Sequence, residues 1–172
     1  MKKVCTSILC VCLSLGASAQ KALHFDASAG VKSSLELYDG TKVAYTAYER
    51  LFYVTNVEDS TYQFLNVYVP DEATQLTPIF LRTYVGGYMA SAASQPQAGD
   101  ASGRALKEGY VVVIPGTRGR NSSITATKTD KKAGIKKGQT VYTGRAPKAI
   151  LDLKAAIRYL RYFDKEMPGD AE

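Results

Sequence analysis

The sequence predicts an α/β fold in which antiparallel strands lead into a parallel sheet flanked by helices. Two apolar runs, 77–85 (TPIFLRTYV) and 109–116 (GYVVVIPG), do not alternate with polar residues. Strands of this kind are buried on both faces, as in the middle of a sheet that helices cover. An amphipathic helix at 146–163 comes after them, and strands that alternate with helices are typical of α/β proteins.

The antiparallel part is predicted before these runs. Residues 34–57 read as two extended pieces around Asp39-Gly40, a dipeptide that favours a hairpin turn. Residues 61–70 (TYQFLNVYVP) alternate again, and Pro70 ends them. We expect these segments to form antiparallel strands at one side of the sheet.

Two helices and one long loop complete the predicted domain. Residues 102–109 read as the end of a helix that stops at Gly109. Residues 117–145 show no periodicity, which predicts a long loop. The final helix, 146–163, is expected to place one apolar stripe on the sheet, made of Ile150, Leu153, Ile157 and Leu160.

The N-terminus reads as a secretory signal peptide. Lys2 and Lys3 precede an apolar run, 4–15, and the small residues Ala17 and Ala19 have the spacing that a signal peptidase requires. We therefore expect residues 1–19 to be removed, and the rest, 20–172, to be secreted or periplasmic. No long apolar span lies in that remainder, so no membrane association is expected after cleavage.

All the cysteines, Cys5, Cys10 and Cys12, lie in the segment that would be removed. A lipid-modified cysteine is the alternative to simple cleavage, but bulky residues directly precede Cys10 and Cys12. After cleavage the chain would contain no thiol, no disulfide and no cysteine-ligated metal.

Charge is distributed unevenly along the chain. Residues 20–103 hold five Lys or Arg against nine Asp or Glu, whereas 104–165 hold fifteen against four. A basic half can bind nucleic acid, or it can be a solvated loop and helix face. We expect the solvated surface and no nucleic acid, and an anionic or carboxylate-bearing substrate is also compatible.

The sequence does not contain a recognisable catalytic set. His24 is the only histidine, and it lies close to the predicted N-terminus, a poor place for a positioned base. There is no Gly-x-Ser-x-Gly elbow, no metal-ligand spacing and no phosphate-binding or dinucleotide motif. No metal or cofactor is therefore expected.

A family resemblance accounts for this absence. The succession NVYVP, PIFLRTYVGGYM, GYVVVIPGTRGR and APKAILDLKAAIRYLRYFDKEMPGDAE resembles the N-terminal part of a secreted α/β-hydrolase, of the carboxylesterase-like tannase and feruloyl-esterase type. The resemblance covers about residues 60–172, and its last segment corresponds to the helix before the nucleophile strand. It implies that 20–172 is the incomplete N-terminal part of one domain. The nucleophile, acid and histidine are expected beyond Glu172, so this chain alone is expected to be inactive.

The resemblance also implies half of an oxyanion hole at Gly86 and Gly87. In this fold one donor N–H comes from the loop after the third strand, and glycine brings the backbone close to a developing oxyanion. Tyr84 and Val85 stand where the His-Gly-Gly-Gly form has His and the first Gly, so the donating N–H stays open. The alternative is a plain Gly-Gly turn.

Three further residues are candidates near this site. Arg118 and Arg120 follow the next central strand, and each either braces the loops under the site or lies in a surface turn. Tyr88 is expected either to line a substrate pocket or to pack on its neighbours.

The expected function is that of a secreted serine hydrolase acting on small-molecule carboxylic esters. Two alternatives stay open, a serine peptidase of the prolyl-oligopeptidase kind and a non-catalytic secreted binding module. The sequence leaves the substrate and the oligomeric state open.

Overall fold

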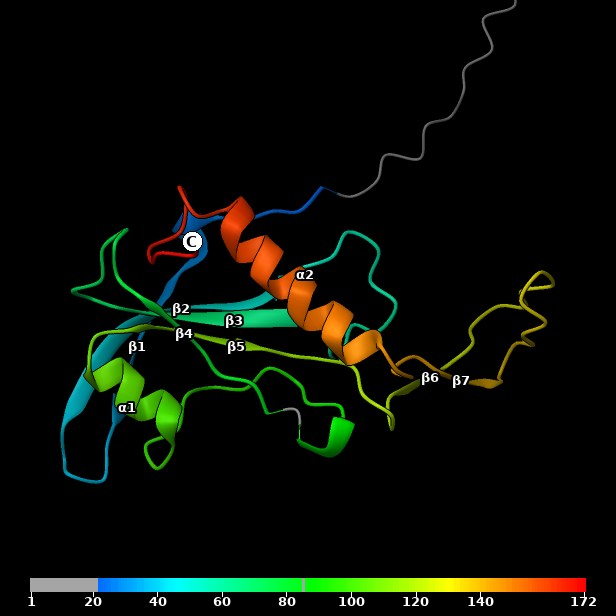
Figure 1. Cartoon of the computed structure of the whole chain (residues 1–172), viewed down its shortest axis with the longest axis horizontal. Helices are drawn as coiled ribbons and strands as arrows, with labels where there is room; N and C mark the ends of the chain where they lie inside the picture. The colour runs from blue at the N-terminus through cyan, green and yellow to red at the C-terminus, as the bar shows by residue number, and fades with distance from the viewer. Residues whose placement is uncertain (1–21, 85) are drawn as a thin grey trace, which may run out of the picture.

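The computed structural model describes residues 22–84 and 86–172, which form a mixed five-stranded sheet with a helix on either face (Figure 1). The predicted signal peptide, 1–19, lies outside these residues. No helix in the described part of the chain is long and apolar enough to cross a membrane. The predicted α/β class is confirmed, but the sheet is mostly antiparallel.

The first two strands form the predicted hairpin. A short 3-10 helix, η1 (Ala27–Ala29), precedes β1 (Val31–Glu36), which pairs antiparallel with β2 (Lys42–Phe52). Gly40 adopts a positive φ of 79° in the turn between them, a conformation that favours glycine.

Strand β3 (Phe64–Pro70) lies in the middle of the sheet, between β2 and β5, and all its residues are buried. The prediction of an alternating strand at one side of the sheet was therefore wrong. Its polar side chains are buried because they have partners: the Tyr68 hydroxyl lies 3.0 Å from Glu49 Oε1 and the Asn66 amide donates to that hydroxyl at 3.1 Å.

The two apolar runs give one central strand and one edge strand. Strand β5 (Val111–Pro115) is fully buried, as predicted. Strand β4 (Ile79–Leu81) has three residues, all half-buried, and it ends the order β1-β2-β3-β5-β4. It was predicted as a central strand; in the structure it is parallel to β5 and at the edge of the sheet.

The open side of β4 meets the last residues of the chain at one point. Pro78 and Asp170 form an isolated parallel bridge, in which the Asp170 N–H donates to the Thr77 carbonyl at 2.8 Å. The Gly169 N–H donates to the Thr74 carbonyl at 3.0 Å. The C-terminal segment therefore runs beside the beginning of β4, and in the direction of β4.

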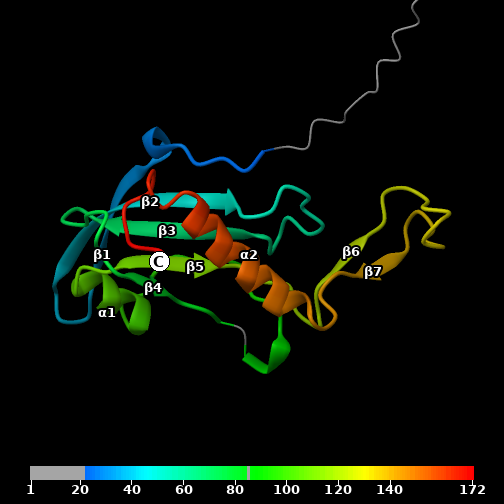
Figure 2. The same ribbon diagram turned by 45° about the horizontal axis from the view of Figure 1, so that its top comes forward.

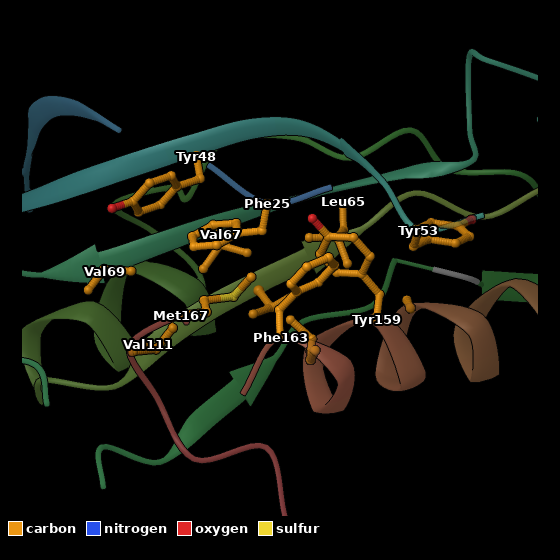
Figure 3. Close-up of a cluster of buried hydrophobic side chains, with 13 residues drawn as sticks. Phe25, Tyr48, Tyr53, Leu65, Val67, Val69, Val111, Tyr159, Phe163 and Met167 are labelled. Atoms are coloured by element: carbon orange, nitrogen blue, oxygen red, sulfur yellow. The ribbon is translucent and has the colours of Figure 1, made fainter. Parts of the chain in front are cut away.

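The sheet has a separate core on each face, because successive strand residues point to opposite sides. Helix α1 (Ala101–Lys107) covers one core, and Gly109, with φ of 83°, follows it as predicted. Helix α2 (Lys148–Tyr162) covers the other core (Figure 3). The first core contains Tyr45, Tyr68, Leu106, Val112 and Ile114, and the second contains Leu65, Val67, Val111, Val113, Tyr159, Phe163 and Met167.

Helix α2 contacts the sheet with a face that overlaps the predicted one only in part. Its buried residues are Ala149, Asp152, Ala156, Tyr159 and Leu160. Ile150 and Ile157, which were expected in the apolar stripe, are 62% and 39% exposed. Leu160 is buried as predicted, and Leu153 is half-buried.

The long loop predicted at 117–145 contains a small hairpin. Strand β6 (Ser123–Thr125) pairs antiparallel with β7 (Thr140–Tyr142), and the hairpin projects away from the five-stranded sheet (Figure 2). Its lysine-rich tip is exposed to solvent, as expected for a solvated loop.

Candidate functional site

The glycine pair follows β4 and forms the 3-10 turn η2 (Gly86–Tyr88). Gly87 and Tyr88 both adopt left-handed φ values, 58° and 60°. The Gly86 N–H donates to the Tyr84 carbonyl at 2.9 Å, whereas no acceptor among the described residues takes the Gly87 N–H. Apart from their own chain neighbours, no atom of the described residues lies within 4 Å of where a Cβ of either glycine would be. The Gly87 amide is therefore the accessible donor of the pair.

The loop after β5 packs directly against the glycine turn. A Cβ on Gly119 would lie 2.1 Å from the Ala90 nitrogen and 2.3 Å from the Met89 carbonyl carbon. The Arg120 N–H donates to the Tyr88 carbonyl at 2.9 Å, and the Ala90 N–H donates to Asn121 Oδ1 at 2.7 Å. The loop 117–122 thus fixes the position of the loop 86–91.

Arg118 lies beneath this contact and is 4% exposed. Its Nη2 donates to Asp152 Oδ1 at 2.7 Å and its Nε to Oδ2 at 2.9 Å, a bidentate pair. The Arg118 backbone N–H donates to the same Oδ2 at 2.9 Å. Burial alone would lower the pKa of Arg118, but the hydrogen bonds and charge of Asp152 outweigh it and raise that pKa. Arg118 therefore stays charged and ties the loop after β5 to helix α2.

Other polar side chains extend this network to the segment before β3. Glu58 also accepts from Arg118 Nη1, and Lys148 Nζ donates to Glu58 at 2.9 Å. On the other side, the Thr143 hydroxyl donates to Asp59 at 2.9 Å, and the Gln63 amide donates to Asp152 at 3.3 Å. This network joins three segments that are distant in sequence: the segment before β3, the loop after β5 and helix α2.

The other predicted residues lie as follows. Arg120 is exposed, and its Nε lies 3.2 Å from the Met89 sulfur. Tyr88 is half-buried, and its hydroxyl is buried without a hydrogen-bond partner in the part of the chain described. The hydroxyl of Thr117 on the facing loop has no partner there either. His24 is exposed and lies on another part of the surface, where its carbonyl accepts from the Tyr159 hydroxyl at 2.6 Å.

Sequence reasoning missed Asp152, Glu58 and Gln63. Asp152 lies outside the apolar stripe that the sequence predicted for this helix, so its burial, and its need for a partner, were not apparent from the sequence. Its partner is 34 positions away, so no local pattern could identify the pair. Within residues 22–84 and 86–172, no group of His, Cys, Asp or Glu could hold a metal ion.

The ion pairs of Glu58 predict an acid-dependent contribution to stability. The pKa of Glu58 lies below its usual 4.5, first because Lys148 donates to it, with Arg118 adding to the effect against partial burial. A lowered folded-state pKa means that this stabilisation is present above 4.5 and is lost as the pH falls through the folded-state value. We expect Glu58→Gln to be less stable than wild type at neutral pH, with a difference that shrinks below pH 4.5.

Urea denaturation of both proteins across this pH range measures the difference. Glu72→Gln is the matched control, because Glu72 is exposed and forms no ion pair among the described residues. A Glu58→Gln difference that stays constant on acidification would contradict the assigned ion pairs.

Solved structures resemble this arrangement over most of the chain. The crystal structure of Fusobacterium nucleatum tannase superposes with a TM-score of 0.70 and 37% identity over 88% of this chain. These neighbours are tannases. The tannin acyl hydrolase from Lactobacillus plantarum superposes with a TM-score of 0.67 and 36% identity over 87% of this chain. A tannin acyl hydrolase in complex with ethyl gallate superposes with a TM-score of 0.66 and 34% identity over 87% of this chain.

The likeness to tannases covers part of their length. This chain spans about a third of each tannase, with 32% of the first and 33% of the other two. Neither a family model nor a curated protein matches the sequence. The similarity supports a tannase-like hydrolase, as the resemblance in the sequence implies.

Proposed function

We propose that this chain is the N-terminal part of a serine ester hydrolase of the tannase kind. The observation that carries the proposal is the Gly87 N–H, which is accessible, lacks an acceptor among the described residues, and follows a parallel strand. Identity of 34–37% to three tannase structures supports the family. The serine, acid and histidine would come from residues beyond Glu172, so the chain would be inactive by itself.

The proposal includes a larger parallel sheet flanked by helices. Strands β4 and β5 are parallel, and α1 and α2 lie on opposite faces of the sheet. Further parallel strands would add beside β4, the edge at which the C-terminal segment already forms a parallel bridge.

In this reaction the Gly87 amide would act on the transition state. Attack by serine on the ester carbonyl places negative charge on the carbonyl oxygen, and a backbone N–H directed at that oxygen stabilises it by roughly 3 kcal/mol. The Gly86 N–H already donates to Tyr84, so we assign it the role of shaping the turn. The unpartnered hydroxyls of Tyr88 and Thr117 are further groups that could meet substrate or neighbouring side chains.

The proposed substrates are small esters of phenolic acids. The support is the tannin acyl hydrolase in complex with ethyl gallate, which is 34% identical to this chain. The proposal requires no cofactor and no nucleic acid. Export is also proposed from the sequence of residues 1–19, and the mass of the protein purified from its natural host would then correspond to a mature chain that begins at Gln20.

Replacing Gly87 is the direct test of the assigned donor. An alanine there must adopt φ near 58°, which is strained for any residue with a Cβ, so we expect Gly87→Ala to displace the amide. In the enzyme read to its natural stop codon, kcat for ethyl gallate should fall by about 10-fold to 1000-fold, with a smaller change in KM.

Gly86→Ala is the matched control. Gly86 has open space around its Cβ position and no positive φ, so its replacement should leave kcat within a few-fold of wild type. Equal losses in the two variants would contradict the assignment of Gly87.

Two measurements separate this proposal from its alternatives. Sequencing the gene past codon 172 should show an open frame with a Ser-containing elbow, and an immediate stop codon would favour a binding module. Comparing the whole protein on acyl esters and on peptide amides should show preference for esters, whereas faster cleavage of the amides would favour a peptidase. Clear ester turnover by residues 20–172 alone would contradict the missing catalytic set.

A further inference from the structure

A cavity of about 500 Å³ lies between the N-terminal segment and the end of β2. Its lining residues all belong to 22–24 and 50–60, so it shares none with the loops 86–91 and 117–122. A volume in this range is sufficient for a small organic ligand. Most of the wall is apolar, formed by Leu23, Leu51, Phe52, Val54 and Val57.

Arg50 is the basic residue that β2 places on this wall, and its backbone is strained. The register of β2 against β3 shifts between Tyr48 and Leu51, which marks a bulge, and Arg50 has φ of 57°. Glycine would adopt this conformation without the cost that a side chain adds, on the order of 1 kcal/mol. Bulges re-aim side chains, and here the bulge directs an arginine to the edge of a cavity.

The strained conformation is held from beneath by a buried side chain. The Arg50 N–H donates to Asn66 Oδ1 at 3.0 Å, and Asn66 is 5% exposed. The Asn66 amide nitrogen in turn donates to the Tyr68 hydroxyl at 3.1 Å and to the Ser94 carbonyl at 3.2 Å. The position of Arg50 is therefore set by the sheet itself.

The guanidinium group is ordered by two aromatic rings and not by an acid. It lies 4.7 Å from the ring centroid of Phe64 and 5.6 Å from that of Phe52. No ion pair involves Arg50 within the described part of the chain. Stacking occupies the faces of a guanidinium and leaves its N–H edge available for an anion.

We propose that this cavity binds a carboxylate carried on an apolar chain or ring. The planar N–H edge of Arg50 matches the two oxygens of a carboxylate, and the aliphatic and aromatic wall matches the apolar part. One guanidinium balances one negative charge, which favours a monocarboxylate over a phosphate ester with more charge. The proposal does not depend on ester hydrolysis by this protein.

Calorimetric titration of the chain with octanoate and with 1-octanol tests the proposal. The two probes share the same hydrocarbon length and differ in the carboxylate. Octanoate should bind wild type at least ten-fold more tightly than 1-octanol, because a hydrogen-bonded charge pair adds to the apolar contact. Arg50→Gln should lose this preference, so that both probes bind it with similar affinity.

Two further variants complete the experiment. Arg104→Gln, which changes an exposed arginine on α1, should retain the wild-type preference. Val57→Trp, which fills the cavity without a change in charge, should lower the affinity of the protein for both probes. Circular dichroism verifies that each variant is folded. If Arg50→Gln does not fold, Arg50→Lys is used in its place, and it should lose less of the preference for octanoate over 1-octanol.

The outcomes are distinct. Equal affinity of wild type for the two probes, or an unchanged preference in a folded Arg50 variant, would overturn the role of the guanidinium. Absence of octanoate binding at millimolar concentration, or binding that Val57→Trp leaves unaffected, would overturn the cavity as the site.

Discussion

Replacing Asp152 with alanine is expected to lower the free energy of unfolding by about 3–5 kcal/mol. Asp152 is 2% exposed, and its carboxylate accepts three hydrogen bonds from the nearly buried Arg118. Without it the guanidinium would retain Glu58, whose side chain is 45% exposed, as its remaining acidic partner. A buried charge without its partner costs far more than the net contribution of the intact pair.

Urea denaturation measures this loss. Glu166→Ala, which removes an exposed carboxylate just after α2, is the matched control and should change stability by less than about 0.5 kcal/mol. The double variant Arg118→Met/Asp152→Leu should recover much of the loss, because an apolar pair leaves no buried charge. A loss below about 1 kcal/mol for Asp152→Ala would contradict a tightly coupled pair.

Gly119→Ala is expected to separate the two loops of the candidate site. The added Cβ would lie 2.1 Å from the Ala90 nitrogen and 2.7 Å from the Tyr88 oxygen, both backbone atoms that cannot rotate away. Overpacking of this kind costs about 1–3 kcal/mol. The backbone must move, so the contacts of the loop 86–91 with the loop 117–122 should weaken.

Hydrogen exchange followed by mass spectrometry reads this movement at the peptide that contains residues 86–91. Its amides should exchange faster in Gly119→Ala, while peptides from β1 should be unchanged. Gly86→Ala serves as the control, because its Cβ would meet no atom within 4 Å. Unchanged exchange at 86–91 would mean that the facing loop does not hold the glycine turn.

The elements predicted correctly are those that are determined by residues near one another in the sequence. The turn at Gly40 and the end of α1 at Gly109 depend on glycine at positive φ, which a single residue provides. Strand β5 was predicted because a continuous apolar run belongs to a strand buried on both faces, and all its residues are buried.

The errors concern properties that depend on distant partners. Strand β3 was predicted at one side of the sheet, yet Glu49 and Ser94 supply the partners that allow Asn66 and Tyr68 to be buried in its middle. Strand β4 has the composition of a central strand, but its place in the sheet depends on the order in which strands pair. The buried face of α2 was predicted only in part: Leu160 lies on it, but Asp152 and Tyr159 lie there in place of Ile150 and Ile157.

Of the candidate site, too, one part could be predicted from the sequence and the rest required the structure. The glycine pair became a candidate from the sequence because the family resemblance places an oxyanion donor in the loop after the third strand. The choice of Gly87 over Gly86 required the structure, since it depends on which N–H already has an acceptor. The network around Arg118 required it too, because its partners come from the segment before β3 and from α2.

The parallel bridge between Pro78 and Asp170 sets a polarity for the open edge of β4. Any strand that extends this bridge must run in the same direction as β4, because the hydrogen-bond pattern of a parallel pair admits no reversal. Its carboxyl end would then arrive at the level at which β4 ends and the glycine turn begins. In open α/β sheets ligands bind at that level, outside the carboxyl ends of parallel strands. Under the proposed function, a strand added beside β4 in this direction would therefore end near the Gly87 amide.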